Sequence, residues 1–274
     1  GIDVGGTFTD LLCLNTETQE LLSEKVPSIP GSQWKGVLGA LEQLGIDYGE
    51  IRAFVHGTTI ATNALLERKG AKTGLVTTDG FRDTLEIGRT RRLIGGLFDI
   101  KFVKPKALVS RDLRVEIGER VAADGEVLQS VDDVDFAPVV EKFRDSGVEA
   151  IAVAFMNSYR NSENEDKALA KLQALAGDVP VCASTGVVPE KGEFERFSTC
   201  VLNAYLTPVV TTYLETLAAE LEGQGISAPV SVMGSNGGVM TLDQAAKFAA
   251  GTFLSGPVGG AGGAVRICEM AGVD

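Results

Sequence analysis

The sequence predicts an α/β fold whose mixed sheet begins with three strands and a helix, in the order β-β-β-α. Strand-like runs come first at 1–4, 9–14 and 21–26, and a tight glycine turn joins the first two as a hairpin. Apolar residues with helical spacing follow over 31–44. Strand-like and helix-like segments then alternate, which favours a sheet that is partly parallel.

The later elements follow from the same periodicities. The further strands are predicted at 51–56, 72–77, 150–154, 179–183 and 230–233. The further helices are predicted at 58–68, 81–87, 131–146, 162–175, 193–221 and 257–271. We expect Pro208 to lie inside the longest helix and to kink it, because proline removes one backbone hydrogen bond.

Residues 89–130 interrupt the alternation with Arg-rich and Pro-containing loops. We interpret them as an inserted or rim subdomain. Residues 1–88 then form the first part of the main domain, and residues 131–274 form its remainder and the start of an interdomain region.

Composition excludes several classes of partner. The formal net charge of −12 argues against a nucleic acid or an anionic membrane surface, which both require clustered Lys and Arg. No segment approaches the ~18 uninterrupted apolar residues of a membrane helix. The four cysteines are widely separated and form no C-x-x-C pair, so we expect a reducing, cytoplasmic location. The chain begins at Gly1, from which we expect a fragment or a processed form.

The segment DVGGTFTD, residues 3–10, has the composition of a phosphate-binding turn. Gly5 and Gly6 lack a Cβ, so backbone amides can approach a phosphate closely, and the Thr7 and Thr9 hydroxyls can donate hydrogen bonds. We predict that these four residues bind a nucleotide phosphate. Such a turn at the start of a β-β-β-α unit favours the actin-like, ribonuclease-H-like ATPase fold class.

Two aspartates flank this turn. Asp3 lies at a strand end, where its carboxylate can hold Mg²⁺ through water. Asp10 can position a nucleophile or a metal-bound water, because phosphoryl transfer depends chiefly on positioning and on neutralising oxygen charge. We predict catalytic roles for both residues. An ordinary glycine hairpin with an aspartate at each end remains the alternative.

The only histidine, His56, lies where a strand passes into a helix. Free amides at a helix start, together with the neighbouring Gly57, Thr58 and Thr59, suit an anionic or carbonyl ligand. We predict that His56 orients the substrate or donates a proton. The alternative is a histidine that caps a strand end.

Two glycine-rich segments also follow strands. In the segment SGPVGG, Ser255 and Gly256 open a helix that can bind an anion. In the segment SNGG, Asn236 and Gly237 lie at a strand end, where open α/β sheets gather ligands. Close helix packing explains the first segment equally well, and a simple turn explains the second.

Charged residues cluster at two further places and are weaker candidates. An arginine group can bind a carboxylate or a phosphate through two hydrogen bonds, although such residues more often form solvated ion pairs. The candidates are Arg89, Arg91, Arg92, Glu193, Glu195, Arg196 and Asn203.

Several segments together resemble the hydantoinase A/oxoprolinase family. The matching segments are DVGGTFTD (3–10), HGTTIATNALLERKGAKTGLVTTDGFRD (56–83), GEFERFSTCVLNAYLTP (192–208), SNGG (235–238) and SGPVGG (255–260). They cover almost the whole chain in the expected order.

The resemblance implies an enzyme that uses ATP and Mg²⁺ to phosphorylate the carbonyl oxygen of a cyclic amide before ring-opening hydrolysis. It also implies a separate B-type subunit as partner, and we expect an oligomer. Family members include subunits of acetone and acetophenone carboxylases, so ketone carboxylation is the first alternative. A sugar or acetate kinase of the same fold is another, and a nucleotide-gated scaffold is the non-enzymatic one.

The chain departs from the family pattern at its end. Family members continue into a second phosphate-binding turn and an adenosine-binding region, whereas this chain stops at Asp274. We therefore expect the second nucleotide-binding domain to be missing, and we expect this chain alone to be inactive.

Overall fold

The computed structural model describes residues 1–29, 31–89, 101 and 103–272. The chain divides into two compact units. Unit 1 comprises Gly1–Gly70 and Val209–Asp274, and unit 2 comprises Ala71–Pro208.

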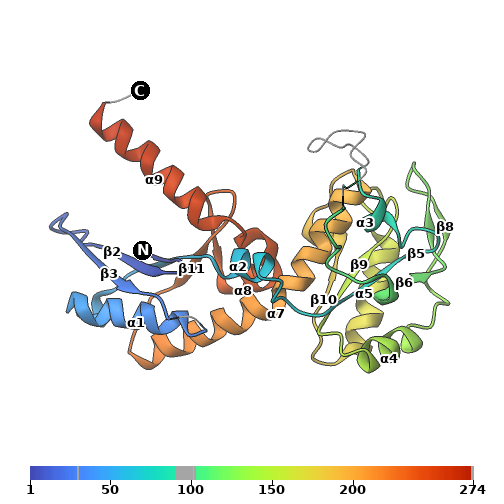
Figure 1. The fold of residues 1–274 in the computed structure, drawn as a ribbon, viewed down its shortest axis with the longest axis horizontal. Helices are drawn as coiled ribbons and strands as arrows, with labels where there is room; N and C mark the ends of the chain where they lie inside the picture. Colours follow the sequence, from blue (N-terminus) through green and yellow to red (C-terminus); the bar gives the residue numbers. More distant parts are fainter. Residues whose placement is uncertain (30, 90–100, 102, 273–274) are drawn as a thin grey trace. The chain divides into compact units, whose positions relative to one another are not determined.

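Unit 1 is built on a six-stranded sheet in the order β12-β11-β4-β1-β2-β3 (Figure 1). Its strands are β1 (Ile2–Val4), β2 (Phe8–Leu14), β3 (Leu21–Pro27), β4 (Phe54–Thr58), β11 (Val230–Met233) and β12 (Val239–Thr241). Its helices are α1 (Gln33–Leu44), η1 (Tyr48–Glu50), α2 (Ile60–Leu66), α8 (Leu242–Lys247), η3 (Ala249–Thr252) and α9 (Ser255–Ala271). Strand β1 pairs antiparallel with β2 and parallel with β4. The predicted mixed sheet with a β-β-β-α start is therefore confirmed.

Side-chain alternation gives this sheet a buried face and an open face. Ile2 and Val4 of β1 are buried, and Asp3 between them points the other way. In β2, Leu11 is buried while Asp10 is exposed. Because residues opposite each other on neighbouring strands share a face, the two aspartates lie on the open face.

Helix α1 packs on the buried face, against β1, β2 and β3. Gly45 ends the helix in the left-handed conformation at φ 62°, which glycine adopts without steric cost. Gly36 allows the close approach to β2, because a Cβ at this position would lie only 2.8 Å from Thr9 Oγ1. The helix and the three strands together form the core beneath the first hairpin.

Unit 2 has its own four-stranded sheet in the order β10-β9-β5-β6, with every neighbouring pair parallel. These strands are β5 (Thr73–Thr78), β6 (Arg114–Ile117), β9 (Ala150–Ala154) and β10 (Val181–Ala183), and β7 (Arg120–Val121) pairs with β8 (Val127–Gln129) as a hairpin. The helices are α3 (Thr84–Ile87), η2 (Arg111–Leu113), α4 (Ala137–Asp145), α5 (Glu163–Ala176), α6 (Ser184–Val187) and α7 (Glu193–Gly223).

The two central strands of this sheet, β5 and β9, are buried along their whole length. A parallel sheet is normally covered on both faces, and the continuous apolar run of β9 reflects that. The core is tightly packed, because a Cβ on Gly74 would lie 2.7 Å from the Phe143 ring. Helix α7 contributes to both units, since the boundary after Pro208 falls within it, and Pro208 lies inside the helix as predicted.

Some element boundaries differ from the prediction. The strand predicted at 51–56 is observed at Phe54–Thr58, and the helix predicted at 131–146 is observed at Ala137–Asp145. The predicted insertion, 89–130, stays a prediction; within this range, β6 pairs with β5 in the sheet of unit 2. Among the described residues, no helix is both long enough and apolar enough to span a bilayer.

Candidate functional site

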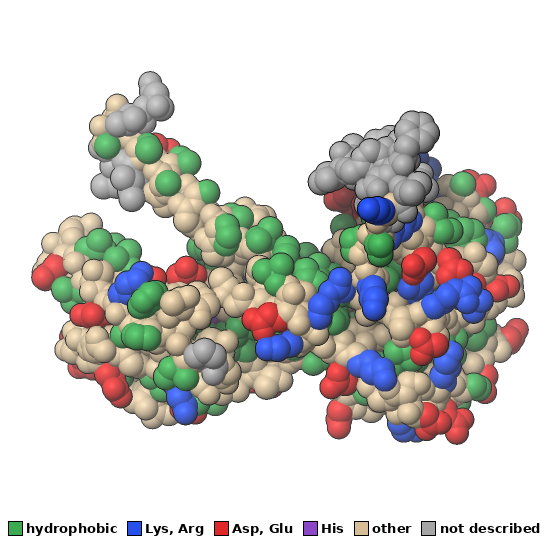
Figure 2. Space-filling model, in the orientation of Figure 1, with side chains coloured by type: hydrophobic (Ala, Val, Ile, Leu, Met, Phe, Trp, Pro, Cys, Tyr) green, Lys and Arg blue, Asp and Glu red, His purple; other side chains and the backbone are tan. Residues whose placement is uncertain are grey.

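The open face of the unit 1 sheet carries a pocket of about 550 Å³. Figure 2 shows unit 1 hollowed between α9 and the β2–β3 hairpin, where this pocket lies. Glycines 256, 259 and 260 of α9 form one side of the lining. The charged residues of the lining are Asp3, Asp10, Glu24 and Lys25.

Strand register aligns the functional groups in one row. Asp3 lies opposite Asp10 on β2 and opposite Gly57 on β4. Asp10 in turn lies opposite Lys25 on β3. Opposite residues point to the same side of a sheet, so two carboxylates and one ammonium group face the pocket together.

Lys25 and Asp10 form an ion pair, with 2.5 Å between Nζ and Oδ1. Both side chains are more than half exposed, at 57% and 53%. A pair of this kind contributes only about 0.2–1 kcal/mol to stability. Its main effect is therefore on the orientation of the Asp10 carboxylate.

Asp3 lies in a different environment, beside the backbone of β4 and the start of α9. Burial of its carboxylate raises the pKa of Asp3, and the negative charge of Asp10 raises it further. A Cβ on Gly57 would lie 2.8 Å from Asp3 Oδ1, and one on Gly256 would lie 3.5 Å from it. The absence of side chains at these two positions makes room for the carboxylate.

The predicted phosphate-binding turn follows β1 and lies outside the lining of this pocket. The Gly5 amide donates to Phe8 O at 3.0 Å and closes the turn. Within the described part of the chain, the exposed Gly6 and Thr7 donate no backbone hydrogen bond. Their N–H groups are thus available to an external hydrogen-bond acceptor.

Thr9 is fully buried and belongs to the other face of the sheet. Its hydroxyl lies 3.0 Å from Ser28 Oγ, which donates to Gly5 O at 2.8 Å. Thr9 therefore contacts the turn indirectly, through Ser28, from the buried face of the sheet. Its predicted contact with a phosphate stays a prediction.

His56 is also fully buried, on the face opposite to Asp3 and Asp10. Its Nε2 lies 2.9 Å from the hydroxyl of Tyr213 on α7, while its buried Nδ1 has no hydrogen-bond partner among the described residues. Burial lowers the pKa of His56 from 6.5 to about 3, so the ring is neutral. The predicted catalytic role of His56 stays a prediction, and this packing does not support it.

The polar residues after His56 are engaged within the fold. Thr58 Oγ1 accepts from the Ile60 amide at 3.2 Å, and Thr58 O accepts from Ser255 Oγ at 3.2 Å. The Thr59 hydroxyl donates to Val4 O at 3.1 Å. These bonds connect β1, β4 and the first turn of α9, and so they fix the backbone that surrounds Asp3.

Asn236 and Gly237 form the turn between β11 and β12. Asn236 Oδ1 accepts from the Gly238 amide at 2.9 Å, and Gly237 has φ 81°. This local bonding accounts for both residue types as turn formers. Their predicted contact with a ligand stays a prediction.

No His, Cys, Asp or Glu side chains gather in groups of three or more that could hold a metal ion, as far as the described residues extend. The Asp3–Asp10 pair is nevertheless a pair of oxygen ligands on adjacent strands. Mg²⁺ is often bound by one or two carboxylates together with substrate phosphates and water. The pair therefore fits this ion when a nucleotide supplies the remaining ligands.

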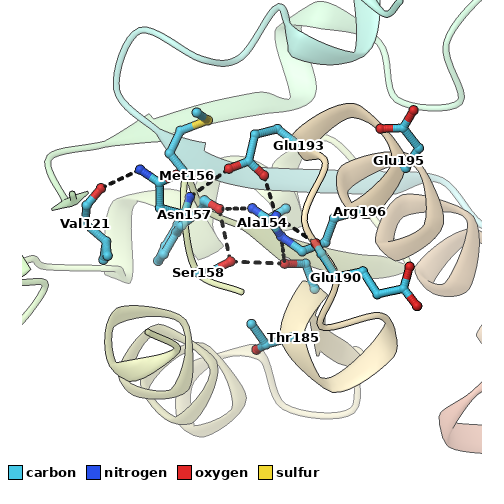
Figure 3. Close-up of polar contacts among 12 residues, drawn as sticks. Val121, Ala154, Met156, Asn157, Ser158, Thr185, Glu190, Glu193, Glu195 and Arg196 are labelled. Atoms are coloured by element: carbon cyan, nitrogen blue, oxygen red, sulfur yellow. Dashed lines mark hydrogen bonds and ion pairs between the residues drawn. The ribbon is translucent and has the colours of Figure 1, made fainter. Parts of the chain in front are cut away.

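Arg196, one of the weaker candidates, lies in unit 2 at the centre of a buried network (Figure 3). Its guanidinium donates to Phe155 O at 2.6 Å and to Ser184 Oγ at 3.0 Å, and it forms an ion pair with Glu193. Glu165 accepts from the same Ser184 hydroxyl at 2.7 Å. These groups satisfy one another, so the network fixes the loop after β9.

Glu195 points away from this network (Figure 3) and pairs with Arg89 through two hydrogen bonds of 2.5 and 2.9 Å. Asn203 is fully buried in α7. Arg91 and Arg92 lie outside the described residues. In the part of the chain that the structure describes, the Arg89–Glu195 pair joins this arginine group to the acidic start of α7.

Of the residues predicted from the sequence, Asp3, Asp10, Gly57 and Gly256 come together in the pocket. Sequence reasoning missed Lys25. Its position can be found from the hairpin turn at residues 15–20. Counting the same number of residues away from this turn along both antiparallel strands brings Lys25 opposite Asp10.

Comparisons with known proteins give consistent matches. Residues 1–175 match the family described as Hydantoinase/oxoprolinase N-terminal region, and residues 196–274 match the family described as Hydantoinase/oxoprolinase. Caprolactamase subunit alpha of Pseudomonas jessenii is 34% identical over 100% of this chain and 40% of its own. Acetophenone carboxylase gamma subunit of Aromatoleum aromaticum is 30% identical over 99% of this chain and 39% of its own.

Two solved structures resemble the whole chain. The crystal structure of the ATP-dependent caprolactamase from Pseudomonas jessenii has a TM-score of 0.87 at 34% identity, covering 100% of this chain and 40% of that one. The nucleotide-free acetone carboxylase structure has a TM-score of 0.85 at 26% identity, covering 99% and 40%. The predicted actin-like α/β fold is confirmed by this likeness. The chain spans about two fifths of the length of these relatives.

Proposed function

This chain belongs to the hydantoinase/oxoprolinase family, and on that premise we propose that it forms the N-terminal part of an ATP-dependent hydrolase acting on cyclic amides. In this proposal the enzyme phosphorylates the amide carbonyl oxygen before the ring opens. The observation that carries the proposal is the row of Asp3, Asp10 and Lys25 across three strands beside the Gly5-Gly6 turn.

Each group in the row has a distinct role in the proposal. Asp3 would hold Mg²⁺ through water. Its carboxylate has space beside Gly57, and neither residue opposite it on the neighbouring strands is a cation. Asp10 orients the reacting group, and Lys25 keeps the Asp10 carboxylate turned toward β3. The free amides of Gly6 and Thr7 bind phosphate oxygens.

The chemistry suits such a site. An amide carbonyl is a poor electrophile, and transfer of a phosphoryl group from ATP to its oxygen creates a good leaving group. Phosphoryl transfer asks a protein mainly to align the reactants and to neutralise charge on oxygen. One carboxylate for Mg²⁺ and a second to orient the reacting group, together with backbone N–H groups for phosphate, meet those requirements.

Ketone carboxylation is the second candidate reaction, since the relatives include an acetophenone carboxylase subunit and an acetone carboxylase. It shares the first step, in which a carbonyl or enol oxygen receives the phosphoryl group. The two reactions differ in the next step: in hydrolysis water attacks the activated carbon, whereas in carboxylation the carbon beside the activated carbonyl attacks the carbon of bicarbonate or of the CO₂ derived from it. A sugar or acetate kinase of the same fold is a more distant alternative.

Partners follow from the same reasoning. Two relatives are named as subunits, so we propose that a second, B-type subunit completes the reaction and that the assembly is oligomeric. We also propose that the remainder of the enzyme supplies the adenosine site and a second phosphate-binding turn. A cytoplasmic location is part of the proposal and agrees with four cysteines in the thiol form.

The decisive experiment measures ADP release by the full-length enzyme with its B-type partner. Hydantoin, 5-oxoproline and caprolactam test the cyclic-amide reading, acetone and acetophenone with bicarbonate test the ketone reading, and glucose and acetate test the kinase reading. We expect ADP release with a cyclic amide, accompanied by ring-opened product in equal amount. ADP release with a ketone alone, or with a sugar alone, would overturn the first proposal in favour of the corresponding alternative.

A further inference from the structure

Two cysteines far apart in the sequence touch in unit 2. Cys182 lies in β10 and Cys200 lies in α7, and their sulfur atoms are 3.8 Å apart. We propose that Cys182 and Cys200 form a redox-active dithiol, which a hydroperoxide oxidises to an intramolecular disulfide. This inference is independent of the reaction proposed above.

The geometry brings the two side chains face to face. Each sulfur lies 3.7 Å from the backbone carbonyl oxygen of the other cysteine, so the two backbones also approach closely at this point. A disulfide requires an S–S distance of about 2.05 Å. Side-chain rotation and a small approach of β10 to α7 close the remaining gap.

The two thiols differ in accessibility. Strand β10 is at the edge of the unit 2 sheet, and Cys182 keeps partial contact with solvent. Cys200 is fully buried, and its sulfur lies 3.5 Å from Val153 O. Cys182 is therefore the more accessible residue of the two.

The two thiols also differ in acidity. Hydrogen bonds from the Cys200 thiol, the Asn203 side chain and the Ala204 backbone lower the pKa of Cys182, although burial opposes them. The bond to Cys182 and burial together raise the pKa of Cys200. The thiolate is the reactive form of cysteine, so Cys182 is the attacking group and Cys200 the resolving group.

The reaction is a two-electron oxidation of the dithiol by the hydroperoxide. The Cys182 thiolate attacks one peroxide oxygen, so that an S–O bond forms, the O–O bond breaks and hydroxide leaves to become water. The Cys200 sulfur then attacks Cys182, so that the S–S bond forms, the S–O bond breaks and the departing hydroxide takes the Cys200 proton as water. Overall, two thiols and one hydrogen peroxide give one disulfide and two waters.

The new bond would close a loop that contains α6 and the start of α7. Glu193 and Arg196 lie within this loop and form the buried network beside β9 (Figure 3). Cross-linking a loop restricts the unfolded chain, so the oxidised form is expected to unfold at a higher temperature than the reduced form. Dithiothreitol should reverse the shift.

The test exposes the native, reduced protein to hydrogen peroxide in slight molar excess and then blocks the remaining thiols with iodoacetamide. Peptide mapping under non-reducing conditions should find Cys182 joined to Cys200, while Cys13 and Cys268 are recovered as alkylated thiols. Titration should show the loss of two of the four thiols. The midpoint temperature of thermal unfolding should rise. Dithiothreitol should restore both the thiol count and the midpoint temperature.

The variants Cys182→Ser and Cys200→Ser provide matched controls. Cys200→Ser should accumulate sulfenic acid at Cys182, which dimedone traps, and Cys182→Ser should keep Cys200 reduced. If either variant fails to fold, the thiol count and peptide map of the unmodified protein still decide the question. The proposal would be overturned if Cys182 and Cys200 both remain thiols after Cys268 is completely oxidised. It would also be overturned if a sulfenic acid at Cys182 never converts to a disulfide.

Discussion

Asp3 and Asp10 are chemically identical side chains that the fold places in different surroundings. Lys25 pairs with Asp10, whereas Asp3 faces the bare backbone of Gly57 and has a raised pKa. In the proposed function, it is the ionised form of Asp3 that holds Mg²⁺. Activity should therefore decline on acidification at a higher pH than an ordinary aspartate with a pKa of 3.8 would cause.

The first prediction concerns Asp10. Asp10→Asn keeps the shape of the side chain but removes its charge, so substrate-driven ADP release by the full-length enzyme should fall by roughly 100-fold or more. Thermal unfolding should be nearly unchanged, because the residue is exposed. Glu17→Gln is the matched control, since Glu17 forms an even more exposed ion pair with Arg52 outside the pocket. Equal loss in both variants, or none in Asp10→Asn, would remove Asp10 from the mechanism.

The second prediction concerns His56, whose pKa burial lowers to about 3. A base with a depressed pKa in the folded state contributes stability above its unfolded pKa of 6.5, and this contribution is lost as pH falls. The free energy of unfolding should therefore decrease by up to about 1.4 kcal/mol per pH unit below pH 6.5.

Urea titrations of the wild type and of His56→Gln at several pH values between 6.5 and 4 measure this dependence. The variant should be less stable at neutral pH, because the bond to Tyr213 is altered, but its stability should depend less steeply on pH. Parallel curves for the two proteins would contradict the assignment.

The sequence predicts catalytic roles for Asp3, Asp10 and His56, and the structure puts His56 on the opposite face of the sheet from the two aspartates. The register explains the difference, because Asp3 lies opposite Gly57 while Ile2 lies opposite His56. A shift of one residue changes the face of a strand to which a side chain points. Local sequence does not fix the pairing between β1 and β4, which are separated by α1, so the face of His56 could not be predicted.

At the scale of elements, β4 must pass close to β1 and still leave space for a carboxylate. Gly57 meets both requirements, since a Cβ there would lie 2.8 Å from Asp3 Oδ1. This makes the backbone of β4 part of the site, although no β4 side chain in the row contributes a functional group.

The third prediction follows from this contact. Gly57→Ala should displace the Asp3 carboxylate and reduce kcat/KM for Mg-ATP by up to about 100-fold, because small misplacements are costly in catalysis. Gly39→Ala is the matched control, since a Cβ on Gly39 in α1 meets no atom within 4 Å. That change should leave turnover intact and stabilise the helix by about 0.5–1 kcal/mol. An active Gly57→Ala enzyme with normal magnesium dependence would contradict the proposed place of Asp3.

Element types were largely predictable, and element limits less so. The β-β-β-α start is confirmed because alternation and helical spacing are strong in this segment. The helix predicted at 131–146 begins only at Ala137, where the Asp135 carboxylate accepts from the Ala137 amide and Pro138 fits the first turn. The acidic residues before it form a loop, which hydrophobic spacing alone does not reveal.

At the scale of the molecule, the chain leaves unit 1 after Gly70 and returns to it within α7. The sequence predicts an inserted subdomain at residues 89–130, because this segment interrupts the alternation. Strand β6, which comes from the later part of the segment, pairs with β5 in the sheet of unit 2. Such long-range pairing depends on tertiary packing and not on local composition.

The fourth prediction concerns the chain as a whole. The 274-residue chain spans about two fifths of the length of its relatives, and its pocket is lined by one carboxylate pair, Asp3 and Asp10. Isothermal titration of this chain with Mg-ATP should give a Kd weaker than about 1 mM, and no ADP should form with any cyclic amide. The full-length enzyme is the control and should bind at least about tenfold more tightly. Lactam hydrolysis by the isolated chain would contradict the expectation of an incomplete site.

The ion pair between Lys25 and Asp10 gives this site a sensitivity to dissolved salt. Because both side chains are more than half exposed, small ions reach them freely, and the Debye length is only about 8 Å at physiological ionic strength. As salt concentration rises, Lys25 holds Asp10 for a smaller fraction of the time. If Asp10 acts as proposed, ionic strength is therefore one of the quantities that set how often its carboxylate is aligned for reaction.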